Sequence, residues 1–380
     1  MIFHANRKEL LHLAQKASRA VPEDLKLELL RGIHLQADAE MGMVTLTATN
    51  MEVAIRASLA ANVEESGQTV ISPHLLLGML SKLDGDTVSV SSIKPTILQV
   101  KGGQAVFQIS VLDGKEYPLP EIPFPEDAVS VSNIKTLAKC TPFTQPKGNG
   151  KPTMQCVRLS LHENGLHADA CDGTRIFHLL GDTECAGNAC ILVPASSLRI
   201  LAGISEDTDV YEMAITDKTV VFWDGTLFFS ARLIAGDFLD IGAVLQQFQP
   251  RFTVQIDAAV FCNAVSAIIP VAKGGMPVEV KLLSGHICLS CESESGSCSH
   301  DLPAITTGAS ATPFYYNARK LWELLRMLTG PMQLELSERG ELRIQTDTVT
   351  CYQSPVRAPS AKKKAAAKEP GKKAQRQKAA

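Results

Sequence analysis

Three cysteines and one histidine in the last third of the chain have the residue types of a zinc site. They are spaced Cys288-x2-Cys291-x6-Cys298-x-His300, and thiolates with imidazoles are ligands that tetrahedral zinc prefers. Apolar and polar residues alternate through this segment, which is typical of a β-strand. An offset of three then turns Cys288 and Cys291 to opposite faces. We therefore expect these cysteines to be thiols that bind no metal. A Cys/His metal-binding enzyme is the alternative from a different functional class of protein.

Asp172, Arg175 and the nine histidines are the other groups that could support catalysis. No nucleophile elbow, phosphate-binding loop or His-Glu metal motif accompanies them. The pair Asp172-Gly173 is typical of a tight turn. We therefore predict a non-catalytic protein with no metal and no cofactor.

The ten cysteines are scattered along the chain. The N-terminal stretch 1–8 lacks the apolar run of a signal peptide, and the sequence has no run of about 18 apolar residues that could cross a membrane. Cysteines of cytosolic proteins stay reduced and often pack as small apolar residues. The sequence therefore predicts a cytoplasmic protein with reduced thiols.

Charge is distributed unevenly along the chain. The formal net charge is −3. Residues 359–380 hold seven lysines, Arg376 and Glu369, a net of +7, which leaves −10 for residues 1–358. The acidic body argues against coating by nucleic acid on all sides, although a local basic surface is still compatible with it. The tail has no apolar periodicity, so we predict that it is disordered.

The elements that must position these residues recur three times. Each copy begins with an amphipathic helix, and in the first copy Leu10, Leu13, Ala14 and Ala17 show helical spacing. A hairpin of two alternating strands with a glycine turn follows, then a third strand, a second helix and a closing hairpin. The predicted helices are 7–21, 133–143 and 258–272 for the first of each copy, and 72–83, 194–204 and 317–328 for the second.

Equivalent residues of the copies keep one interval. Thr49 precedes Cys171 by 122 residues, and Cys171 precedes Cys291 by 120. The predicted hairpin strands are 33–37 with 44–48, 157–161 with 166–170, and 278–282 with 287–291, and the closing hairpins are 87–111, 209–233 and 332–352. The fold class is therefore α+β, with two helices on a curved antiparallel sheet in each copy. The predicted domains are 1–122, 123–249 and 250–358, followed by the basic tail 359–380.

Four segments resemble motifs of one family, the bacterial DNA polymerase III beta subunits or sliding clamps. Residues 45–52 resemble its first-domain "LTGTDLE", residues 170–175 its second-domain "TDGHR", residues 236–240 its "GxFPDY", and residues 354–358 its terminal "MPMRL". With the repeat, the resemblance covers residues 1 to about 358. It implies three clamp domains per chain and a head-to-tail homodimer that closes a six-domain ring around duplex DNA.

The resemblance also implies the partners. The ring would hold double-stranded DNA without reading its sequence, and would tether the DNA polymerase III catalytic subunit, the clamp loader and other proteins with a clamp-binding motif. It would be a processivity factor of DNA replication in the cytoplasm, associated with the nucleoid and not with a membrane. A divergent accessory clamp with altered partner choice is the nearer alternative.

A weak basic lining that touches phosphates is what a sliding ring requires. The predicted helices and one loop supply the candidates, and Lys320 adds a further one. The DNA-binding candidates are Lys8, Arg19, Lys82, Lys135, Lys139, Lys147, Asn149, Lys151, Arg199, Lys273, Arg319 and Arg326. Asp24 stands near the position of a DNA-contacting arginine of the family.

In the family, short peptides of partner proteins bind an apolar pocket between the second and third domains. The matching positions here are Met154, Cys171, Gly173, Thr174, Arg175, Ile176, Leu239, Val244, Asn317, Pro355, Val356 and Arg357. Several depart from the family. Thr174 replaces a histidine, Leu239 a proline and Ala358 the terminal leucine, and Lys320 stands where a tyrosine is common. Ordinary inter-domain core is the alternative reading of these residues.

The dimer contact of the family matches Phe107 and Ile109 on one side and Ile269 and Pro270 on the other. We expect the first pair on an edge strand, where pairing with a second copy would cover an exposed apolar edge. A strand buried within one domain is the alternative.

Overall fold

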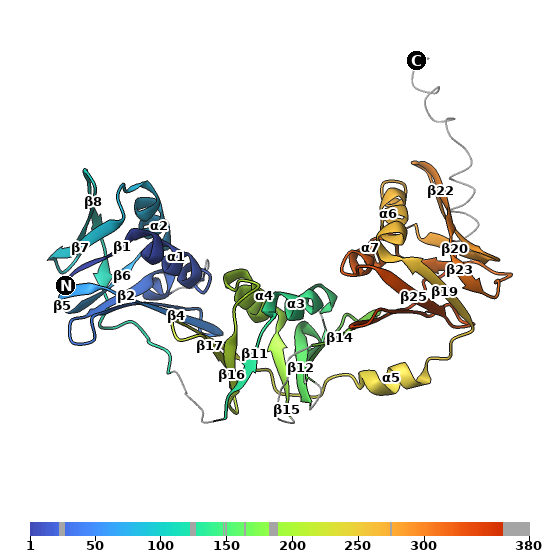
Figure 1. The fold of residues 1–380 in the computed structure, drawn as a ribbon, viewed down its shortest axis with the longest axis horizontal. Helices are drawn as coiled ribbons and strands as arrows, with labels where there is room; N and C mark the ends of the chain where they lie inside the picture. The colour runs from blue at the N-terminus through green and yellow to red at the C-terminus, as the bar shows by residue number, and fades with distance from the viewer. Residues whose placement is uncertain are drawn as a thin grey trace, which may run out of the picture. The chain divides into compact units, whose positions relative to one another are not determined.

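The structure, a computed structural model, describes residues 1–22, 27–121, 127–146, 148, 150–162, 165–181, 189–273 and 276–359. Contacts divide the chain into two compact units. Unit 1 comprises Met1–Thr141, Cys156–Leu166 and Asp182–Gly236, and unit 2 comprises Pro142–Gln155, His167–Gly181 and Asp237–Ala380. Helices pack on antiparallel sheets in both units, which is the α+β class (Figure 1). In the described ranges, no helix has the length and apolar character needed to span a membrane.

Unit 1 contains two antiparallel sheets. Sheet A has the order β5-β1-β7-β8-β9 and sheet B the order β10-β6-β2-β3-β4-β18-β17-β16-β11. The bounds are β1 Ile2–Asn6, β2 Ile33–Asp38, β3 Met43–Thr49, β4 Val53–Ala60, β5 Asn62–Glu65, β6 Gly67–Ile71, β7 Thr87–Lys94, β8 Ile97–Gly102, β9 Ala105–Ser110, β10 Leu112–Asp113, β11 Val129–Val131, β16 Tyr211–Ile215, β17 Thr219–Trp223 and β18 Leu227–Arg232. Unit 1 also holds the pair β12 (Cys156–His162) and β15 (Ala189–Pro194).

Helices α1 (Arg7–Ser18) and α2 (Pro73–Lys82) pack together in unit 1, as do α3 (Ile134–Leu137) and α4 (Ala195–Ile204). Asn6 begins α1, because its Oδ1 accepts hydrogen bonds from the backbone N–H groups of Lys8 at 3.0 Å and Glu9 at 3.2 Å. The four residues of α1 that the helical spacing selected, from Leu10 to Ala17, are the buried ones.

Unit 2 contains a second pair of sheets. Sheet D has the order β22-β21-β20-β24, and the other sheet runs in unit 2 through β13-β14-β27-β26-β25-β19-β23. The bounds are β13 Gly165–Cys171, β14 Arg175–Leu180, β19 Phe252–Asp257, β20 Val278–Leu283, β21 His286–Ser293, β22 Gly296–Pro303, β23 Ile305–Thr307, β24 Phe314–Tyr316, β25 Pro331–Leu336, β26 Leu342–Gln345 and β27 Val349–Gln353. The helices are α5 (Ile241–Gln247), α6 (Ala258–Ile268) and α7 (Ala318–Leu325), of which α6 and α7 pack together.

The structure confirms much of the predicted repeat. The hairpins β2–β3 and β20–β21 pair at Leu35↔Leu46 and Val280↔Leu289. Each closing hairpin is instead a three-stranded meander, β7 to β9, β16 to β18 and β25 to β27. A strand that the sequence analysis missed also precedes the first helix of each copy, namely β1, β11 or β19.

The prediction of a single helix over 133–143 is wrong from residue 138 onward. It is the short α3 followed by a 3₁₀ segment, Ala138–Phe143, with Pro142 inside. Proline has no N–H to donate and its ring clashes with the carbonyl four residues earlier, so an α-helix cannot continue there. Helix α5 was not predicted from the sequence either.

One kind of strand pairing joins the predicted copies within each unit. In unit 1, β4 of the first copy pairs with β18 of the second, with Ala54 opposite Ser230. In unit 2, β14 of the second copy pairs with β27 of the third, with Ile176 opposite Tyr352. Strands β4 and β14 hold the same place in their copies, as do β18 and β27. In the third copy the strand equivalent to β4 and β14 is β22, and in the first copy the strand equivalent to β18 and β27 is β9.

Candidate functional site

An apolar cluster in unit 2 contains the largest share of the predicted pocket residues. Cys171, Ile176 and Ile241 are buried at its centre, and around them pack Met154, Phe238, Val244, Leu245 and Tyr352. Strand pairing fixes the positions of three of these residues, because Ile176 lies between Cys171 on β13 and Tyr352 on β27. Burial raises the pKa of the Cys171 thiol, so this cysteine is a neutral packing residue.

Helix α5 covers the cluster. Asp240 begins the helix, since its Oδ1 accepts a hydrogen bond from the backbone N–H of Ala243 at 3.0 Å. Ile241, Val244 and Leu245 then follow at offsets of three and four, so one face of the short helix contacts the cluster.

A tight turn after Cys171 forms a polar edge beside the cluster. The Oδ1 atom of Asp172 accepts hydrogen bonds at 2.8 Å from the backbone N–H groups of Thr174 and Arg175 and from the Thr174 hydroxyl. Gly173 has a φ of +90°, which side chains rarely tolerate, so glycine is required there. The turn therefore exposes Thr174 and directs Arg175 inward.

Arg175 is buried and fully engaged. Its guanidinium donates to Asp172 Oδ2 at 2.9 Å, to the Lys320 carbonyl at 3.0 Å and to Glu323 Oε2 at 2.9 Å. It also lies 5.0 Å from the centre of the Phe143 ring. Arg175 thus holds the turn against α7 through its hydrogen bonds to both.

Lys320 lies on the same polar edge. Its Nζ atom donates to Asp172 Oδ2 at 3.1 Å and to the Thr174 hydroxyl at 2.6 Å. Burial alone would raise the pKa of the Asp172 carboxyl, but the Arg175 charge and the hydrogen bonds from Thr174 and Arg175 outweigh it and lower that pKa to about 2. Lys320, considered as a DNA candidate from sequence, is therefore engaged in an ion pair beside the cluster.

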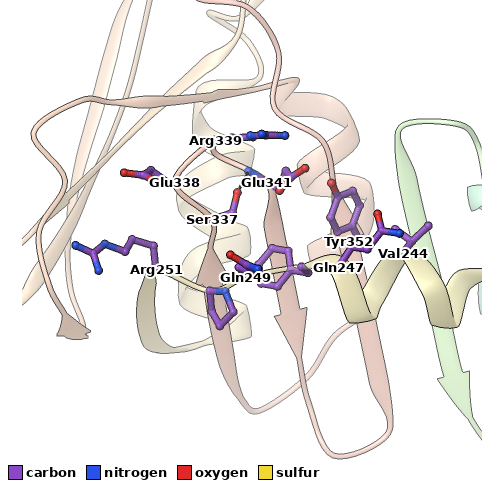
Figure 2. Close-up of a pocket in the computed structure, with 11 residues that line it drawn as sticks. Val244, Gln247, Gln249, Arg251, Ser337, Glu338, Arg339, Glu341 and Tyr352 are labelled. Atoms are coloured by element: carbon purple, nitrogen blue, oxygen red, sulfur yellow. Dashed lines mark hydrogen bonds between the residues drawn. The ribbon is translucent and has the colours of Figure 1, made fainter.

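A cavity of about 870 Å³ opens beside the cluster. Val244 and Tyr352 belong to both, so the cavity begins where the apolar surface ends. Figure 2 shows these two residues at one end, near α5, and Arg251 and Glu338 at the other. The lining turns polar along this direction, with Gln249 between the two ends.

All twelve predicted pocket residues fall in unit 2, in different environments. Four belong to the cluster and three form the turn. Asn317 caps α7 by accepting the Lys320 N–H at 3.0 Å, Pro355 and Arg357 follow β27, and Leu239 and Val356 are 37% and 40% exposed. Four further members of the cluster were not predicted from the sequence: Phe238, Ile241, Leu245 and Tyr352. The helical spacing of 241, 244 and 245 could have found two of them.

The described basic candidates are all exposed. In unit 1 they lie on or next to the helices: Lys8 and Arg19 on α1 and its end, Lys82 on α2, Lys135 on α3, Lys139 in the 3₁₀ segment and Arg199 on α4. In unit 2, Arg319 lies on α7, Arg326 at its end, Lys273 after α6 and Lys151 in a loop. Lys147, Asn149, Asp24 and residues 360–380 of the tail lie outside the described residues.

These basic groups are not equally available to contact DNA phosphates. Lys135 forms ion pairs with Glu206 at 3.4 Å and Asp207 at 3.2 Å. Lys139, four residues later, has no ion pair with any residue that the structure describes. The pairing offsets the charge that Lys135 could offer to a phosphate.

The edge-strand prediction is confirmed. Strand β9, with Phe107 and Ile109, is the last strand of sheet A, and both residues are half-buried. Ile269 ends α6 and is half-buried, whereas Pro270 is exposed. No set of three or more potential ligands, His, Cys, Asp or Glu, is grouped for a metal ion in the described part of the chain.

Comparison with known proteins shows which other chains share this fold. Residues 1–122 match the family model described as "DNA polymerase III beta subunit, N-terminal domain". A beta sliding clamp of Staphylococcus aureus is 22% identical over 346 residues, which cover 86% of this chain and 90% of that one. The Bacillus subtilis DNA polymerase sliding clamp superposes with a TM-score of 0.87 at 20% identity, covering 94% and 100% of the two chains. The Pseudomonas aeruginosa DNA polymerase III subunit beta gives 0.86 at 18%, with the same coverage.

The fold is thus that of the DNA clamps, built from repeated helix pairs on antiparallel sheets. Within that class, the chain is similar to the beta sliding clamps at 22% identity, and its residues 1–122 match the N-terminal domain of the DNA polymerase III beta subunits.

Proposed function

We propose that this chain is a sliding clamp that closes around duplex DNA as a head-to-tail pair of copies. Sliding clamps are non-catalytic processivity factors, and the residues of this site hold the fold together rather than supporting a reaction. The proposal covers the ring, its contact with DNA and the capture of partner proteins.

The repeated strand pairing carries the proposal for the ring. The joints β4–β18 and β14–β27 connect successive copies, and their equivalents β22 and β9 are both edge strands. Sheet B has nine strands, five from the first copy and four from the second, whereas sheets A and D have five and four. Pairing of β22 with β9 of a second copy would repeat the same joint and complete a nine-stranded sheet. Two such joints close a ring.

The exposed lysines and arginines of the helices support non-specific contact with DNA. Flexible side chains that reach phosphates, without groups placed to read base edges, allow a protein to slide along the duplex. The net −10 charge of residues 1–358 limits this attraction to the surfaces where the basic residues gather.

The apolar cluster and the adjoining cavity support partner capture. A short peptide could place apolar anchors against Val244 and Tyr352 and extend polar residues into the cavity, which suits recognition through a few anchors. Partners would be the polymerase catalytic subunit, the clamp loader and other proteins with such a motif. The Lys320–Asp172 pair would shape this chain's choice among them. The protein would act in the cytoplasm, on the nucleoid.

The mass in solution tests the ring. A dimer of twice 40.9 kDa, about 82 kDa, is expected by light scattering at micromolar concentration. Ile109→Asp should shift the mass toward the monomer, because it places a charge on the pairing edge. Val106→Asp is the matched control, since this β9 residue is already 51% exposed. A wild-type monomer at all concentrations would contradict the ring.

A further inference from the structure

Two cysteines on the β21–β22 hairpin are directly opposed. Cys291 on β21 pairs with Cys298 on β22 in the antiparallel register, whereas Cys288 is opposite Asp301. Alternation along the strands places Cys291 and Cys298 on one face of the hairpin and Cys288 on the other. The zinc ligand set suggested by spacing is thus divided between two faces, and only these two thiols are neighbours.

The distance between opposed residues suits a disulfide. Residues directly opposite in an antiparallel pair have Cα atoms about 4.5 or 5.5 Å apart, and disulfides span Cα distances of about 4.4–6.8 Å. Both cysteines are free thiols in the structure. Burial raises the pKa of Cys291, and the neighbouring Cys298 raises it further, in keeping with the closeness of the two groups.

The two thiols differ in exposure. Cys291 is 4% exposed, facing the interior beside α6. Cys298 is half-buried on the edge strand β22, and its Sγ atom lies 3.7 Å from the Ala267 carbonyl at the end of α6. A reagent in solution therefore reaches Cys298 first, and Cys291 is placed to react second.

We propose that Cys291 and Cys298 are a thiol–disulfide site that closes by exchange with a small disulfide such as oxidised glutathione. The Cys298 thiolate attacks one sulfur of the small disulfide, which releases one thiol and leaves a mixed disulfide on Cys298. The Cys291 thiolate then attacks Cys298 Sγ and releases the second thiol. The protein loses two hydrogens and two electrons, and the small disulfide gains both. Strand β22 is also the edge proposed to pair with β9 of a second copy, so oxidation is expected in chains whose β22 edge is unpaired.

Oxidation of the full chain by glutathione disulfide, followed by peptide mass spectrometry without reduction, tests the assignment. A cross-linked peptide containing Cys291 and Cys298, lighter by two hydrogens and restored by dithiothreitol, is expected. Cys288→Ser and Cys190→Ser are matched controls that should leave the cross-link unchanged, since Cys190 is exposed and distant in sequence.

The single variants separate the two roles. Cys291→Ala should accumulate the glutathione adduct on Cys298, because nothing resolves it. Cys298→Ala should leave Cys291 unmodified, because that thiol is buried. A wild-type protein that keeps a stable adduct on Cys298, or that cross-links through Cys288, would overturn the proposal.

Discussion

The Arg175 guanidinium donates to Glu323 at 2.9 Å and so joins the start of β14 to helix α7, although the two residues are 148 positions apart. The side chain of Arg175 is 5% exposed and that of Glu323 31%. Because the same guanidinium holds Asp172, one cation fixes both the turn beside the cluster and the helix next to it.

Removal of this cation should destabilise unit 2. Arg175→Ala removes the buried cation from Asp172, which keeps Lys320, and from Glu323, which keeps the longer contact with Arg319, and the expected loss is about 3 kcal/mol in the free energy of unfolding. Urea denaturation followed by Trp322 fluorescence in a Trp223→Phe background measures it, because Trp322 lies on α7. Arg319→Ala is the control, since its contact with Glu323 is 3.6 Å long and its side chain 79% exposed. Equal losses in both variants would contradict the role of Arg175.

The low pKa of Asp172 predicts that the folded protein loses stability over a defined range of acid pH. Its folded pKa of about 2 lies below the ordinary 3.8. The ionised group therefore stabilises the fold above about pH 4, and this contribution, about 2 kcal/mol, is lost as the pH falls toward 2. Asp172→Asn should be less stable than wild type at pH 7, and the difference should shrink across this window. A difference that is constant from pH 7 to pH 2 would rule out the assigned shift.

The sequence predicted the elements whose pattern is local. Alternation located β2, β3, β20 and β21, and helical spacing located α1. The sequence pattern could not place side chains whose direction depends on contacts with residues far away in the chain. Arg175 was predicted as a pocket residue, but its side chain points inward and donates to Glu323. Lys320 was considered as a DNA contact, but its amine donates to Asp172. The division into three domains stays a prediction, since strand pairing across the copies merges them into two units.

Val244 should be required for peptide binding. Val244→Glu puts a charge on the apolar face of α5, and the expected loss is about 2 kcal/mol, or roughly 30-fold in Kd, for a fluorescent peptide with two apolar anchors. Val210→Glu is the control, because that residue is 55% exposed in unit 1. Fluorescence anisotropy measures both, and unchanged binding by the Val244 variant would remove the cluster as the site.

Two lysines four residues apart should differ in their effect on DNA binding. Lys139→Ala should lower the slope of log K against log salt by about 0.9, the value for one lost phosphate contact. Lys135→Ala should lower it less, since Glu206 and Asp207 already engage that lysine. Binding of a short duplex between 50 and 200 mM salt, the range in which such contacts are screened, measures the slopes. The reverse order would contradict the ranking.

The most direct test of the ring is its retention on circular DNA. The clamp, loaded onto a nicked plasmid by its cognate clamp loader with ATP, should stay bound through gel filtration in high salt, because a closed ring is held by topology and not by charge. Cutting the plasmid once with a restriction enzyme should then release it. Loss from the intact circle in high salt, or equal retention on circular and linear DNA, would contradict a ring that encircles the duplex.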